Sequence, residues 1–193
     1  ALSGIVASRA VFGDRAYGNL LSGTPTSLPR ITRDDIASAY SRAWAPSQSA
    51  LVVVGDIASQ DAAALAQKLF GDWKTDGLTI SPSERIIPTK PRVIVVDMPG
   101  AGQAGVVIAR PGIARHDKDF YAAQVANATL GVGFTSRLNR EIRIKRGLAY
   151  GAGSSVDTRK LTGIVTASTQ TKNPSAPEVA SLIAAEMKRL GEA

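Results

Sequence analysis

The chain has 193 residues, of which 44% are hydrophobic and 20% are charged, a composition typical of a folded globular protein. Lysine and arginine outnumber the acids by 23 to 16, and the net charge of +7 favours anionic partners in general. The absence of cysteine excludes thiol catalysis, disulfides and cysteine-bound zinc, and one histidine, His116, is too few for an ordinary zinc site. No apolar run predicts a membrane span, and the first residues lack the order of a signal peptide. Because the sequence does not begin with Met, we expect a fragment.

Residues 1–75 are predicted to be the end portion of a first α/β unit that is truncated at its start. Its predicted elements are a helix at 32–44, a buried strand at 49–56 and a helix from Ser59 or Asp61 to Phe70. Thr32 and Asp35 have the spacing of a capping box, which fixes the start of the first helix. The strand prediction rests on the apolar run SALVVVGD, which has the length of a buried strand.

The composition then changes at 76–91, where three prolines and the lack of a helical period predict a linker. A second unit is expected at 92–193. Its predicted elements are strands at 92–98, 104–110, 149–157 and 161–171, and helices at 117–130, 135–146 and 174–190. This order predicts an α+β fold in which helices pack on one face of a mostly antiparallel sheet.

A glycine pattern and the histidine are weaker candidates for chemistry. Gly100, Gly102 and Gly105 fit the G-x-G-x-x-G spacing of a nucleotide loop, but the residues that follow are β-branched and end at Pro111. The pattern therefore favours a hairpin turn. His116 precedes a predicted helix without a nucleophile nearby in the sequence, so we assign it no role.

The short helix at 135–146 carries an uneven row of charges. Glu141 is placed to pair with Lys145 and with Arg137, each one turn away. A second row of cations has no acid within reach in the same helix: Arg140, Arg143 and Arg146. These side chains repel one another unless an anionic or carbonyl-rich group lies opposite them.

Arg143 and Tyr150 are predicted to converge across the corner between this helix and the next strand. The small residues GAGSS after Tyr150 leave room for another backbone at Gly151. A guanidinium and a phenol beside an open strand suit the binding of peptide carbonyls or of an oxyanion. Two alternatives stay open: a solvated Arg143 with Tyr150 in the core, and a nucleic-acid surface, which the aromatic fraction of 5% does not favour.

Two stretches taken together resemble the insulinase and pitrilysin family of zinc metallopeptidases, which includes the mitochondrial processing peptidases. They are YGNLLSGTPTSLPRITRDDIASAYSRAWAPSQSALVVVGDI and LGVGFTSRLNREIRIKRGLAYGAGS. The resemblance implies two α/β domains of similar fold, each with a mostly antiparallel sheet, in a half-enzyme that closes with a second half around a peptide. It also implies that zinc is bound through an inverted His-x-x-Glu-His motif and a distant glutamate.

In this family an arginine and a tyrosine seven residues apart bind the substrate backbone and stabilise the tetrahedral intermediate. The resemblance assigns these catalytic and substrate-binding roles to Arg143 and Tyr150, with Gly151 beside them as a substrate contact. It implies a substrate-clamping part of a zinc endopeptidase that acts on peptides or unfolded polypeptides.

The chain departs from the family pattern where the metal is concerned. No His-x-x-Glu-His motif occurs, and residues 1–83 contain no glutamate. We therefore expect this chain to bind no metal and to be inactive alone, with the zinc-bearing half upstream in the same chain or in a partner chain. The alternative is a non-catalytic scaffold or peptide-holding subunit of the same fold, as the core proteins of respiratory complexes are. We expect no nucleic-acid partner, and the exported bacterial relatives favour the periplasm over the cytoplasm.

Overall fold

The computed structural model describes residues 2–74 and 90–192, and contacts divide the chain into two compact units. One unit joins Ala1–Leu21 with Pro82–Ala193, and the other is Ser22–Ser81. Nearly all of the linker predicted at 76–91 lies outside the described residues. Within the described ranges, no helix has both the length and the apolar character needed to cross a bilayer.

The unit Ser22–Ser81 is built around two helices in its described part. Its elements are η2 (Leu28–Arg30), α2 (Arg33–Ala43), η3 (Pro46–Gln48) and α3 (Ser59–Phe70). The predicted capping box is confirmed: the Asp35 N–H donates to the Thr32 hydroxyl over 3.1 Å, and the Thr32 N–H donates to the Asp35 carboxylate over 2.9 Å. Both helices keep apolar side chains exposed, among them Ile36 and Leu69.

Two predicted strands are wrong. Residues 49–56 and 92–98 form no strand, and their apolar side chains are exposed, with Val54 at 92% and Val93 at 90%. Both runs are rich in β-branched residues, which favour extended backbone. A strand also needs a hydrogen-bonded neighbour, and no described residue pairs with either run as a ladder.

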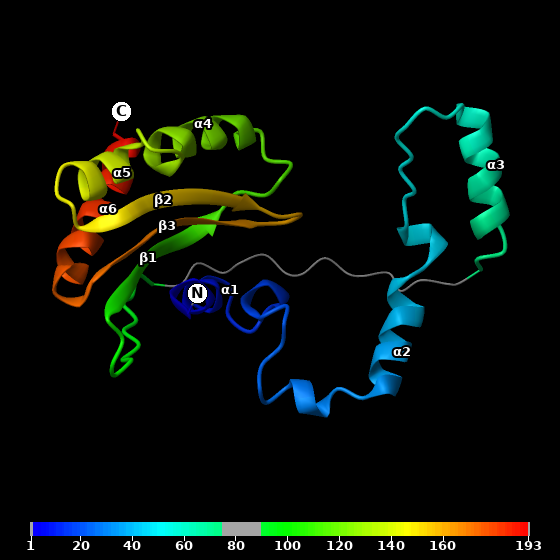
Figure 1. Cartoon of the computed structure of the whole chain (residues 1–193), viewed down its shortest axis with the longest axis horizontal. Coiled ribbons are helices and arrows are strands. Elements are labelled where there is room, and N and C mark those ends of the chain that lie inside the picture. Colours follow the sequence, from blue (N-terminus) through cyan, green and yellow to red (C-terminus); the bar gives the residue numbers. More distant parts are fainter. Residues whose placement is uncertain (1, 75–89, 193) are drawn as a thin grey trace. The chain divides into compact units, whose positions relative to one another are not determined.

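The other unit contains a three-stranded antiparallel sheet with helices around it (Figure 1). The strands are β1 (Gln103–Gly112), β2 (Ala149–Thr158) and β3 (Gly163–Lys172), in the order β1-β3-β2. The helices are α1 (Leu2–Phe12), α4 (Phe120–Gly131), α5 (Arg137–Asn139) and α6 (Ala176–Leu190), and the short segments are η1 (Ala16–Gly18), η4 (Arg140–Ile144) and η5 (Asn173–Ser175). The α+β class and the antiparallel pairing are therefore as predicted.

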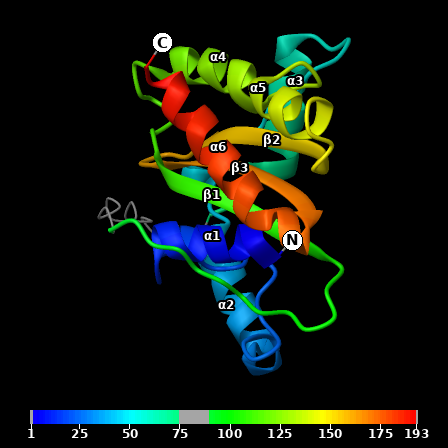
Figure 2. The ribbon, with the colours of Figure 1, turned by 90° about the vertical axis from the view of Figure 1, so that its left-hand side faces the viewer.

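One face of the sheet carries α4, α5 and α6, and α1 lies on the opposite face (Figure 2). The predicted arrangement with helices on one face is thus incomplete, because α1 packs along β1. At Gly105 an added Cβ would lie 2.9 Å from the Ser3 hydroxyl, so α1 approaches β1 closely. At Gly131 an added Cβ would lie 2.2 Å from the Ser154 nitrogen, so only glycine lets α4 end against β2.

The core lies between the sheet and the helices α4, α5 and α6. Its buried apolar side chains are Leu130, Leu138, Ile142, Ala167, Val179 and Ile183. Burial of each large aliphatic side chain contributes roughly 1.5–3 kcal/mol before conformational entropy is counted. Leu138 and Ile142 are fully buried and lie on the segment that also carries the cationic row, so this packing fixes the segment against the sheet.

Candidate functional site

The predicted helix at 135–146 is a short α-turn, α5, that continues into the π-helical segment η4 and ends at Gly147. Gly147 has a φ of +62°, a left-handed conformation that glycine adopts without steric cost. The Leu148 N–H donates to the Ile142 carbonyl over 2.9 Å and closes the turn. The chain then enters β2 at Ala149, so helix and strand meet at the predicted corner.

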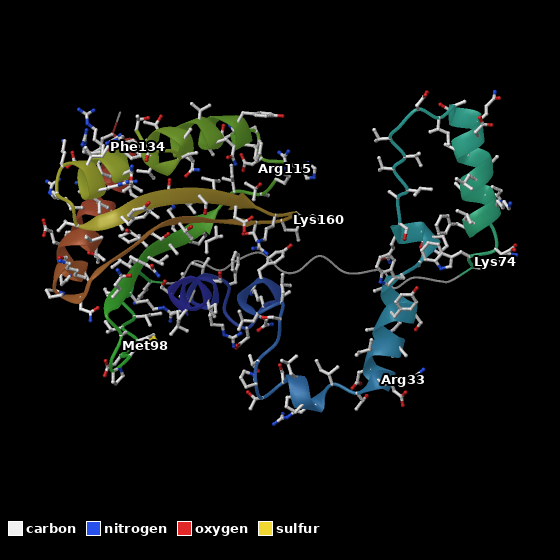
Figure 3. The ribbon with its side chains drawn as sticks, viewed as in Figure 1. Arg33, Lys74, Met98, Arg115, Phe134 and Lys160 are labelled. Atoms are coloured by element: carbon white, nitrogen blue, oxygen red, sulfur yellow. The ribbon has the colours of Figure 1, made fainter. Side chains whose placement is uncertain are left out.

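Arg143 lies close to two aromatic rings at this corner. Its Cζ atom is 4.8 Å from the centroid of the Tyr150 ring and 4.8 Å from that of the Phe134 ring. Phe134 belongs to the loop between α4 and α5 (Figure 3). Each such cation–π contact contributes about 0.5–1 kcal/mol at an exposed position. Contact with the rings does not use the N–H donors of the guanidinium, which lie in its plane.

Tyr150 is 89% exposed, which contradicts the alternative that this ring fills the core. Gly151 beside it is exposed, and both line an open hollow of about 490 Å³ together with Ser3 of α1 and Thr169 of β3. No carboxylate of the described residues forms a salt bridge with Arg143. Tyr150 and Gly151 therefore line one hollow, and the half-buried Arg143 lies beside the Tyr150 ring without an acid partner in the described part of the chain.

The sequence predicted that three arginines of this segment have no acid partner, but Arg146 has one. Arg146 pairs with the Glu141 carboxylate, and its Nε is 3.9 Å from the Glu178 carboxylate of α6. Lys145 pairs with Glu141 as predicted. The expectation of an unpaired Arg146 is wrong because the π-helical turn and α6 both bring acids to it.

Arg137 has a different partner from the predicted Glu141. Its Nε donates over 2.7 Å to the Glu186 carboxylate of α6, which is 49 positions later in the chain. Glu186 is buried and also accepts a hydrogen bond from Arg189 over 2.7 Å. This pairing ties the start of α5, and with it the segment that carries Arg143, to α6.

The hydrogen bonds from Lys145 and, next, from Arg146 lower the pKa of Glu141 below its ordinary value of 4.5. A carboxyl group whose pKa is lowered in the folded state stabilises that state above about pH 5, and this contribution is lost as the pH falls below 4.5. We expect acid unfolding between about pH 5 and pH 3 to depend less steeply on pH in Glu141→Gln. Urea denaturation of the purified protein at several pH values measures this slope. Glu192→Gln, at an exposed acid, is the control, and equal slopes in wild type and Glu141→Gln would contradict the assignment.

The described residues do not fit a metal site. They contain no group of three His, Cys, Asp or Glu side chains that could hold an ion. His116 is exposed before α4. The glycine pattern leads into β1 and not into a helix, so a nucleotide loop is not formed, and the hairpin interpretation is also wrong, because β1 pairs with β3.

Three residues around Arg143 and Tyr150 were missed in the sequence. Phe134 stacks on Arg143, Asn139 is buried beneath the corner, and Thr169 donates to the Gly151 carbonyl over 2.6 Å. Thr169 had a recognisable signal, because its position continues the alternating face of β3 that holds Ala167. A hydroxyl at such a position is buried and needs a hydrogen-bond partner.

Comparison with known proteins relates the whole chain, and not this corner in particular, to one family. A family model described as the peptidase M16 inactive domain matches residues 30–193. An uncharacterized zinc protease of Streptomyces coelicolor is 30% identical over 153 residues, which cover 74% of this chain and 32% of that protein. An uncharacterized zinc protease of Mycobacterium leprae is also 30% identical, over 77% of this chain and 34% of that protein. The chain spans about a third of the length of these curated relatives.

Solved structures agree with the sequence comparison. The peptidase M16 inactive domain from Pseudomonas fluorescens superimposes with a TM-score of 0.90 at 25% identity, covering 97% of this chain and 45% of that one. A protease from Helicobacter pylori has a TM-score of 0.83 at 24% identity, covering 90% and 42%, and shows the same fold. The chain therefore belongs to the peptidase M16 family, the insulinase and pitrilysin type of metallopeptidases that its motifs resemble.

Proposed function

We propose that this chain is the substrate-clamping, transition-state-stabilising part of a zinc metalloendopeptidase that hydrolyses peptides or unfolded polypeptides. One observation carries the proposal: the Cζ atom of Arg143 lies 4.8 Å from the centroid of the Tyr150 ring, and Tyr150 is 89% exposed. Among the described residues, the Arg143 guanidinium forms no salt bridge with a carboxylate. Two relatives are named zinc proteases, which supports peptide hydrolysis as the reaction.

The proposed chemistry is hydrogen-bond donation to a peptide backbone. The Tyr150 hydroxyl donates to the carbonyl oxygen that becomes negative in the tetrahedral intermediate, and Arg143 donates to the same or a neighbouring carbonyl. Donors that are already fixed stabilise the developing charge without reorganisation during the reaction. Gly151 presents no side chain, so an extended substrate can approach the strand at this point.

Zinc belongs to the complete enzyme and not to this chain in the proposal. Because the described residues hold no metal-binding group, the zinc and the residues that bind it come from a segment upstream or from a second half-enzyme. The matched domain description, inactive domain of peptidase M16, supports a chain that is inactive alone.

The finer fold assignment is also part of the proposal. Residues 1–75 would be the end portion of a first unit and 92–193 the second unit, each with a mostly antiparallel sheet as in the mitochondrial processing peptidases. The separate unit Ser22–Ser81 and the exposed apolar runs 51–54 and 93–96 support it, because such runs suit strands that pair with segments of a longer protein. Helix α1 lies in the proposed first unit, 1–75, but it packs on β1, which lies in the proposed second unit, 92–193.

Peptide cleavage tests the proposal and separates it from a peptide-holding scaffold. The complete enzyme, with any partner half and zinc, is expected to cleave a short unfolded peptide, whereas the 193-residue chain alone is not. Arg143→Ala should lower kcat/KM by about 10- to 100-fold, the usual effect of losing a hydrogen bond from a charged donor. Arg140→Ala, which removes an exposed arginine one turn earlier, is the matched control and should stay near wild type.

Two results would decide against the peptidase role. Zinc-loaded complete protein that binds the peptide without cleaving it would identify the scaffold alternative. Equal loss of activity in Arg140→Ala and Arg143→Ala would show a general effect of charge and remove the specific role of Arg143.

A further inference from the structure

β2 contains a bulge where Tyr150 is located. Ala149 pairs with Thr171 and Ala152 with Thr169, so Tyr150 and Gly151 together oppose the single residue between those threonines. In a regular strand, residues three positions apart point to opposite faces. The extra residue lets Ala149 and Ala152 both pack against the core while Tyr150 stays exposed.

Two buried threonines of β3 hold the carbonyls on either side of this bulge. The Thr169 hydroxyl donates to the Gly151 carbonyl over 2.6 Å, and the Thr171 hydroxyl donates to the Leu148 carbonyl over 2.6 Å. Thr169 is 8% exposed and Thr171 is 2% exposed. Because a bulge interrupts the hydrogen bonds of the ladder, these hydroxyls satisfy backbone groups that the regular pairing would otherwise satisfy.

Asn139 joins the bulge to the loop that carries Phe134. Its side-chain amide donates to the Phe134 carbonyl over 2.6 Å, and its oxygen accepts the Ala152 N–H over 3.4 Å. Asn139 is 4% exposed and precedes Arg143 by four positions. One buried side chain therefore contacts both segments whose rings lie near the Arg143 guanidinium.

We infer that Thr169, Thr171 and Asn139 are positioning residues, which hold the bulge in the shape that presents the Tyr150 ring beside Arg143. Each of the three acts through backbone groups: Thr169 and Thr171 bind the Gly151 and Leu148 carbonyls, and Asn139 joins the Ala152 N–H to the Phe134 carbonyl. The inference rests on the proposed function, since it concerns the same peptide-binding site. Thr169 is the most direct of the three because it binds the residue next to Tyr150.

The test is a double-mutant cycle between Thr169→Val and Tyr150→Phe in the complete enzyme, with peptide cleavage as the assay. Valine keeps the shape of threonine and removes the hydroxyl. We expect Thr169→Val to lower kcat by about 10- to 100-fold with a smaller change in KM, as misplacement of a transition-state contact does. The double variant should be no slower than Tyr150→Phe alone, because the hydroxyl that Thr169 positions is already absent.

Matched variants separate positioning from general damage to the fold. Thr166→Val removes the hydroxyl that lies 2.9 Å from the Ser155 hydroxyl on the same two strands, away from the bulge, and should keep activity within about twofold. Thr169→Ser restores a hydroxyl and should recover most of kcat. If Thr169→Val does not fold, the same cycle with Thr171→Val carries the same expectation, through the Leu148 carbonyl.

The outcomes distinguish the two proposals. If Tyr150→Phe is impaired but the threonine variant turns over like wild type, or if the two losses multiply, the positioning role is wrong and the proposed function stands. If Tyr150→Phe itself has wild-type turnover, the proposed function fails, and the positioning role fails with it.

Discussion

Tyr150→Phe in the complete enzyme is expected to lower kcat by about 10²- to 10³-fold, which corresponds to about 2.7–4 kcal/mol of transition-state stabilisation. The substitution removes one hydroxyl and leaves the ring that stacks on Arg143 in place. The lost hydrogen bond is one that strengthens as the substrate carbonyl becomes an oxyanion, so turnover falls more than substrate binding does. Steady-state kinetics on an unfolded peptide measure both parameters.

Zinc content and a second tyrosine provide the controls for this experiment. The metal content of Tyr150→Phe should equal that of wild type, because the described residues contribute no metal-binding group. Tyr121→Phe removes a hydroxyl from another exposed tyrosine, on α4, and should leave kcat unchanged. Activity of Tyr150→Phe within a few-fold of wild type would show that the phenol does not stabilise the transition state.

Glu186→Ala is expected to lower the free energy of unfolding by about 3 kcal/mol, the loss typical when one partner of a buried ion pair is removed. The Glu186 side chain is 6% exposed and accepts hydrogen bonds from Arg137 and Arg189. Without the Glu186 carboxylate, the positive charge of Arg137 loses this partner while its side chain is only 22% exposed to water. Urea denaturation of the purified protein, followed by circular dichroism, measures the change.

Glu178→Ala on the same helix is the matched control for this second prediction. Its carboxylate is exposed and lies 3.9 Å from Arg146, so its removal should cost about 0–1 kcal/mol. Similar losses in the two variants would mean that the Glu186 pair adds no more than a surface ion pair does.

In the unit that contains the three-stranded sheet, the elements that the sequence predicted well are those whose patterns depend on residues close by in the sequence. β1, β2, β3, α4 and α6 occur within a few residues of their predicted bounds. The capping box of α2 also depends only on residues a few positions away. The strands predicted at 49–56 and 92–98 were wrong because strand formation also depends on a neighbour, which no local pattern supplies.

The candidate site likewise has features that could be predicted from the sequence and others that could not. The spacing of Arg143 and Tyr150, the small residues after them and the family resemblance could all be read from the sequence, because they lie on one continuous segment. The partner of Arg137 could not, since Glu186 lies 49 positions away and reaches it only through the packing of α6 on α5.

The sequence by itself determined the class of fold, the family and the pair of residues at the corner, because composition, periodicity and motif spacing are local properties of the chain. Only the tertiary structure decided that the Tyr150 ring is exposed and that Phe134 completes the stack on Arg143. The physical reason is the bulge: the pairing of β2 with β3 sets the direction of each side chain, and Thr169 and Thr171 on the other strand bind the carbonyls on either side of the bulge.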